Sequence, residues 1–126
     1  EGRDLERAQT ILLASWGALD HAVEAVEAAG GRELARGPRG GGRSLRAVIG
    51  HVAEAERAYL SRLGRPATPG TDRTAILDAL ADVGPIGTPP PGPRGGRRWS
   101  ARFFVRRACW HALDHAWEIE DRTTPA

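Results

Sequence analysis

The clearest indication of the architecture is the segment RRACWHALDHAWEIEDR, from Arg106 to Arg122, in a chain of 126 residues. It lies in a longer helical pattern, from Trp99 to about Asp121, whose apolar residues are spread over nearly every side of the helix. Such a helix is expected to be substantially buried, and it therefore needs other helices to pack against. No strand-like alternation stands out, so the sequence predicts an all-α fold, a four-helix bundle.

Two helices are predicted in the first half of the chain. Residues 4–29 carry one apolar seam with alternating spacings of four and three residues, and Gly30 and Gly31 end it. Ser44 is a candidate N-cap for a second helix that runs to about Leu63. Each of these helices has one apolar face to bury.

A shorter third helix is predicted to begin after a cap at Thr71 or Asp72. Residues 84–98 then hold most of the prolines and several glycines, and they predict a long extended crossover between the third and fourth helices. Too little chain follows this segment to form a second domain. We therefore expect one domain over residues 1–126.

The composition limits the partners and the compartment. The formal net charge is only +2, which predicts no strong attraction to nucleic acid or to an anionic membrane. Residues 94–107 do combine arginines with aromatic side chains, but the core needs Phe103 and Phe104, so no nucleic-acid partner is expected. Cys109 is the only cysteine, and no apolar stretch reaches about 18 residues. Cytoplasm is the expected location, with a removed leader left open.

Three histidines form the candidate site. His111 and His115 stand four residues apart, so one helical face presents both imidazoles. Zinc and similar ions accept neutral imidazole and need three or four ligands, and His51 in the second helix is the candidate for the third. Asp114 and Glu118 flank the pair, where carboxylates commonly orient ring N–H groups. The alternative for an isolated pair of this spacing is that both histidines are ordinary residues on a solvated helix face.

The run from Arg106 to Arg122 closely resembles the terminal helix of DinB-like proteins, the DinB/YfiT superfamily. The stretch LRAVIGHVAEAERAYLSRLG, from Leu45 to Gly64, resembles the second helix of that family. Its members are four-helix bundles that bind a divalent metal through one histidine of the second helix and an H-x-x-x-H pair of the last. The resemblance therefore implies His51, His111 and His115 as ligands. The chain is short for this family, with a trimmed crossover.

The resemblance also implies a chemistry, because several members transfer or isomerise thiols with mycothiol, bacillithiol or glutathione-like cofactors. We expect a zinc- or nickel-dependent thiol S-transferase or a related transferase or hydrolase. The alternative is a non-catalytic small-ligand-binding or stress-response bundle of the same fold. The candidates for proton transfer are Glu54, Glu56, Asp114 and Glu118, and Arg107 is the candidate for anchoring a substrate carboxylate. A solvated helix face is the alternative for these charges.

The tryptophans and the cysteine are assigned to packing. Trp16 falls on the seam of the first helix and is expected in the core. Trp110 and Trp117 share a face that could pack inward, line a pocket or form a dimer contact, and a homodimer is expected. Cys109 lies about 160° from His111 on a helical wheel, so we expect a buried apolar residue rather than a metal ligand. His21 lies off the first seam and is expected at the surface.

Overall fold

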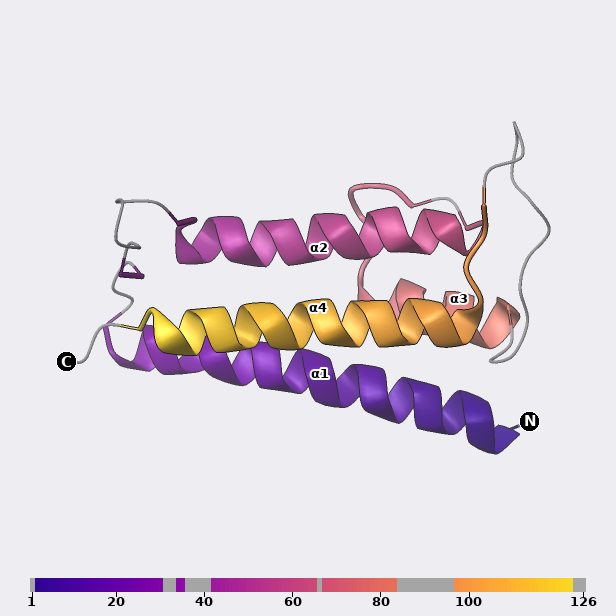
Figure 1. Ribbon diagram of the computed structural model, residues 1–126, viewed down its shortest axis with the longest axis horizontal. Helices are drawn as coiled ribbons and strands as arrows, with labels where there is room; N and C mark the ends of the chain where they lie inside the picture. The colour runs from indigo at the N-terminus through magenta and orange to yellow at the C-terminus, as the bar shows by residue number, and fades with distance from the viewer. Residues whose placement is uncertain (1, 31–33, 36–41, 66, 84–96, 124–126) are drawn as a thin grey trace.

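The computed structural model describes residues 2–30, 34–35, 42–65, 67–83 and 97–123 (Figure 1). This part of the chain contains no strand, and its four helices are α1 (Gly2–Ala28), α2 (Leu45–Arg62), α3 (Arg73–Val83) and α4 (Ala101–Asp121). The predicted all-α class and the number of helices are confirmed. Residues 84–96 of the crossover predicted at residues 84–98 lie outside the described part of the chain. None of the described helices is long and apolar enough to span a membrane.

Local chemistry explains where the helices begin and end. The side chains of Ser44, Asp72 and Ser100 each accept a hydrogen bond from the backbone N–H three residues later, at 3.2, 2.9 and 3.1 Å. Each bond satisfies one of the N–H groups that a helix start leaves free. Gly30 and Gly64 follow the ends of α1 and α2 with φ of 103° and 79°, a left-handed conformation that glycine adopts without steric cost.

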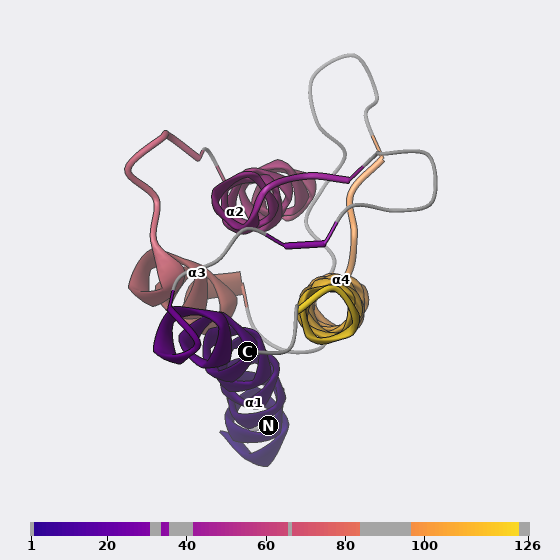
Figure 2. The same cartoon turned by 90° about the vertical axis from the view of Figure 1, so that its left-hand side faces the viewer.

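Helix α4 packs against both α1 and α2. Helices α1 and α4 run parallel and α2 runs antiparallel to both, while the short α3 lies against α1 (Figures 1 and 2). On α4, Ala108, Ala112 and Ala116 are all at most 1 % exposed and form a row of small side chains along the buried side of this helix. Small side chains allow close backbone approach, and α1 packs extensively along α4. Toward their N-terminal ends α1 and α4 diverge (Figure 1).

Helix α4 is substantially buried, as the sequence predicts, but one side of it is exposed, and the prediction that Phe103 belongs to the core is wrong. Phe104 is 0 % exposed, whereas Phe103, Trp110 and Trp117 are 44 %, 55 % and 60 % exposed. These three residues are seven apart and form an exposed aromatic stripe along one side of the helix. Trp16 is buried in the core, as predicted.

A buried carboxyl group ties α1 to α2. Glu56 is 5 % exposed, and its Oε2 accepts a hydrogen bond of 2.5 Å from the indole N–H of Trp16, which is 2 % exposed. The guanidinium of Arg73 lies 5.2 Å from the centre of the Trp16 ring and also binds Asp20 at 2.7 Å. Burial raises the pKa of Glu56, although the hydrogen bond from Trp16 opposes the shift. This carboxyl therefore belongs to the packing of α1, α2 and α3.

Candidate metal centre

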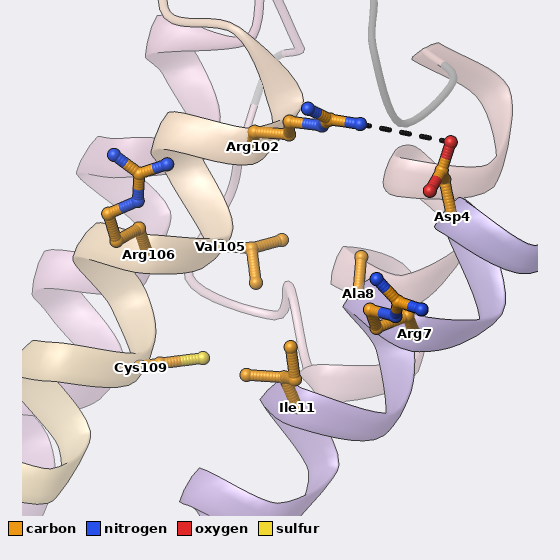
Figure 3. A pocket seen from close by; sticks show the side chains of 8 residues that line it. All are labelled: Asp4, Arg7, Ala8, Ile11, Arg102, Val105, Arg106 and Cys109. Atoms are coloured by element: carbon orange, nitrogen blue, oxygen red, sulfur yellow. Dashed lines mark ion pairs between the residues drawn. The ribbon is translucent and has the colours of Figure 1, made fainter.

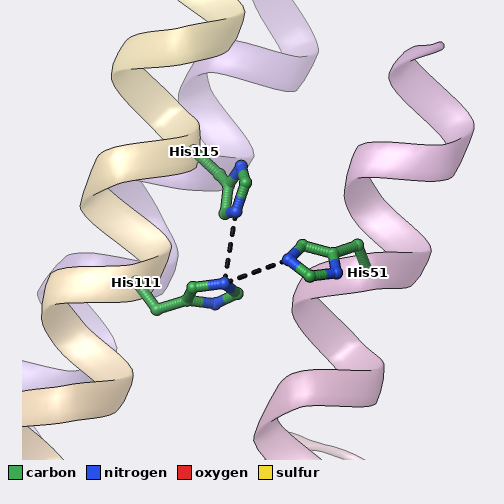
Figure 4. Close-up of side chains that lie close together, drawn as sticks. All are labelled: His51, His111 and His115. Carbon is green, nitrogen blue, oxygen red and sulfur yellow. Dashed lines mark hydrogen bonds between the residues drawn. The ribbon is translucent and has the colours of Figure 1, made fainter. Parts of the chain in front are cut away.

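The structure brings His51, His111 and His115 together between α2 and α4 (Figure 4). The Nε2 atom of His111 lies 3.2 Å from Nε2 of His51 and 3.2 Å from Nε2 of His115. One ligand atom from each ring lies within 4.8 Å of the other two. Antiparallel packing of α2 and α4 produces this arrangement, because it sets the middle of α2 opposite two consecutive turns of α4.

These distances fit a shared metal ion. Two nitrogen ligands that lie about 2.05 Å from one zinc ion at a tetrahedral angle are about 3.3 Å apart. The two measured separations of 3.2 Å are close to that value.

The tautomers of the rings favour the same interpretation. Nδ1 of His115 lies 2.7 Å from Oε1 of Glu118. A carboxylate can only accept here, so His115 donates its Nδ1–H to Glu118, and in the neutral ring this leaves the lone pair on Nε2. Nε2 of His111 then faces two ring nitrogens, and a single N–H cannot make two straight hydrogen bonds. Three lone pairs that converge on one cation satisfy all three Nε2 atoms.

The electrostatic environment favours the neutral form of His111 and of His51. Burial, followed by the charges of His115, His51 and Arg107, lowers the pKa of His111 to about 4. Burial and the charge of Arg43 also lower the pKa of His51. His111 is therefore unprotonated at neutral pH, which is the form that ligates a metal. The Nδ1 atom of His111 is buried with no hydrogen-bond partner among the described residues.

A hydrogen-bonded relay holds His115 in place. Glu118 accepts from His115 through one oxygen and from Arg122 through the other, at 2.7 and 2.6 Å. Partial burial opposes ionisation of Glu118, but these two hydrogen bonds lower its pKa. Arg122 in turn donates to the backbone carbonyls of Ala35 and Arg43, at 2.8 and 2.7 Å. The orientation of His115 therefore depends on backbone outside the two helices that carry the histidines.

Replacing Glu118 with glutamine is expected to weaken zinc binding by about 10- to 100-fold, because the orienting negative charge is lost while the size of the side chain is kept. Competition with a chromophoric chelator would measure this affinity. Glu120→Gln is the matched control, since Glu120 is exposed on the same helix and, within the described part of the chain, accepts no hydrogen bond from a histidine. Equal loss in both variants would contradict a specific relay and point to general charge effects.

Glu54, Asp114 and Arg107 influence the pKa values of the histidines through their charges. Glu54 and Asp114 are exposed, and their charges raise the pKa of His51 and His111 respectively. The guanidinium of Arg107 lies 5.7 Å from the centre of the Tyr59 ring and 4.9 Å from that of Trp110. Roles for these residues in catalysis or substrate binding stay predictions.

Glu56 does not join this site, because its carboxylate is held by Trp16 on another side of α2. The sequence prediction missed Tyr59, whose ring lies 5.8 Å from that of His111 and 5.2 Å from that of Trp99. Tyr59 follows His51 by eight residues, a spacing of about two helical turns that places both on one face. Predicted positions are confirmed for buried Cys109 and exposed His21.

Comparison of the chain with family models, curated proteins and solved structures finds no match.

Proposed function

We propose that this chain binds one divalent metal ion, zinc or nickel, through His51, His111 and His115. The observation that carries the proposal is the separation of 3.2 Å between Nε2 of His111 and Nε2 of each of the other two rings. The lowered pKa of His111 and the carboxylate of Glu118 on His115 support it. Membership of the DinB-like superfamily is part of the same proposal and rests on the two sequence segments that resemble that family.

We further propose that the site activates a low-molecular-weight thiol for transfer. Three neutral ligands leave the charge of the ion uncompensated, and a metal in such a site lowers the pKa of a thiol that occupies an open position. The single cysteine of the chain, Cys109, is buried in the core cluster that α4 shares with α1, so the thiol must come from outside. Arg107, beside the rings, is proposed to bind a substrate carboxylate.

Glu54 and Asp114 are the proposed proton acceptors at this site. Both carboxylates are exposed and close enough to influence the pKa of a histidine ligand. Glu118 is also ionised, but both of its oxygens are engaged, which favours a positioning role over proton transfer. We also propose a cytoplasmic location and a homodimer, and the exposed Trp110 and Trp117 support the latter.

Cobalt substitution tests this function, because cobalt occupies zinc sites and its visible spectrum reports its ligands. The wild-type protein with one equivalent of cobalt is expected to gain a sulfur-to-cobalt charge-transfer band when glutathione or a mycothiol analogue is added. S-methylglutathione, which cannot form a thiolate, should produce no band. Cys109→Ser is the matched control and should behave as the wild type.

Two outcomes separate the alternatives. Cobalt bound without any response to a thiol would favour the non-catalytic ligand-binding bundle. Failure to bind cobalt, zinc or nickel would remove the metal site and with it the transferase proposal.

A further inference from the structure

A cavity lies on the other side of α4 from the histidines. It has a volume of about 390 Å³ and opens between α1 and α4, in the region where these helices diverge (Figures 1 and 3). That volume is within the range of pockets that hold small organic ligands, about 300–1,000 Å³. None of the three histidines lines it.

The inner wall of this cavity is apolar. Val105 and Cys109 project from α4 toward Ala8 and Ile11 of α1 (Figure 3). Val105 and Cys109 are 6 % and 7 % exposed, so they belong to the core and form a floor. Ile11 is 46 % exposed, and its side chain is available to a ligand that enters between the helices. Such a wall favours a hydrocarbon chain or a ring over a polar ligand.

The rim of the cavity is cationic. Arg7 comes from α1, and Arg102 and Arg106 come from α4, while the only acidic side chain of the lining is Asp4. Asp4 lies 3.8 Å from Arg102, an exposed and loose ion pair. Arg7 and Arg106 form no ion pair within the described part of the chain. Two exposed guanidinium groups at the mouth of an apolar cavity are complementary to a carboxylate that carries an apolar tail.

We propose that the cavity between α1 and α4 binds a free amphipathic monocarboxylate, with the tail against Ile11, Val105 and Cys109 and the carboxylate between Arg7 and Arg106. This site is independent of the metal centre, because it uses none of the metal-binding residues and lies on a different side of α4. The cavity size and the single negative charge of the ligand are the two properties that define the class.

The only thiol of the chain provides a direct probe, since Cys109 lines the cavity. Burial raises the pKa of this thiol, so its modification by N-ethylmaleimide is expected to be slow and to depend on access from the cavity. Decanoate below its micelle concentration is expected to slow the modification by about tenfold or more at saturation. Decanol lacks the charge and should require about tenfold higher concentration, because hydrogen bonds to charged groups are the stronger ones.

Charge reversal makes the test specific. Arg7→Glu/Arg106→Glu is expected to lose protection by decanoate and to gain protection by decylammonium. Arg46→Glu, at an exposed position of α2, is the matched control and should retain the wild-type preference. Circular dichroism would establish that each variant is folded. If the double variant does not fold, the single variant Arg106→Ala replaces it, with an expected loss of about tenfold in the affinity for decanoate.

Equal protection by decanol and decanoate, or unchanged decanoate binding in the charge-reversed variant, would overturn the proposal. So would protection by anionic phospholipid vesicles but not by free decanoate. Protection of Cys109 that appears only as the protein dimerises, followed by analytical ultracentrifugation, would assign the cavity to a second copy of the chain instead. Failure of the metal site would leave this experiment unaffected, because it requires no metal.

Discussion

His111→Ala is expected to abolish stoichiometric zinc binding, from near one ion per chain to near none. His111 is the central ring of the three, since its Nε2 contacts both of the others at 3.2 Å. Two remaining histidines on different helices are fewer than the three or four protein ligands that a zinc site needs. Metal analysis of untagged protein would measure the stoichiometry. His21→Ala is the matched control, because His21 is exposed on α1 and outside the cluster.

The same variant should lose the stabilisation that the metal provides. An ion present at 100 to 1,000 times its dissociation constant adds about 2.7 to 4.1 kcal/mol to the free energy of unfolding. For a domain of this size that corresponds to a rise in Tm on the order of 10 °C. Chelation should therefore lower the Tm of the wild type and of His21→Ala, but not that of His111→Ala. A wild-type melting curve that does not move after complete metal removal would contradict this expectation.

The second large effect is expected at the adjacent pair Phe103 and Phe104. Phe104 is 0 % exposed and packs in the core between α1 and α4, so Phe104→Ala should cost about 3–5 kcal/mol through lost burial and an unfilled cavity. Phe103 is 44 % exposed, and its ring packs edge to face on that of Trp99, with 4.8 Å between the ring centres. Phe103→Ala should therefore cost about 1 kcal/mol or less. Urea unfolding of both variants gives the comparison, and similar costs would show that α4 is rotated from the orientation described.

The helices could be predicted because their signals are local. The seam of α1, the Ser44 cap of α2 and the Asp72 cap of α3 each depend on residues within a few positions of one another. The histidine cluster could be predicted for a related reason. The spacing of four between His111 and His115 fixes two rings on one face, and only the contribution of His51 required an assumption about packing.

The remaining features depend on how the helices pack. Nothing local separates Phe103 from Phe104, because a helix that is apolar nearly all round gives no preferred side. The buried side is defined by packing, because Ala108, Ala112 and Ala116 share core clusters with residues of α1. The hydrogen bond between Trp16 and Glu56 joins residues 40 positions apart, and no spacing rule reaches that far. The sequence alone does not distinguish Glu56 from Glu54. In the structure Glu54 is exposed, whereas Glu56 is buried against Trp16.

Folding of the metal-free chain changes the pKa values of two buried groups in opposite directions. It favours the protonated form of Glu56 and the neutral form of His111. The pKa of Glu56 is raised from 4.5, so above pH 4.5 the folded state holds this proton more tightly, and the free energy of unfolding falls as pH rises. The pKa of His111 is lowered from 6.5 to about 4. Between these two pH values His111 binds a proton in the unfolded state but not in the folded state. The free energy of unfolding therefore falls as the pH drops through this interval. The two slopes oppose each other in mild acid. In mild acid, the gain in the free energy of unfolding from Glu56 therefore offsets part of the loss that His111 would cause by itself.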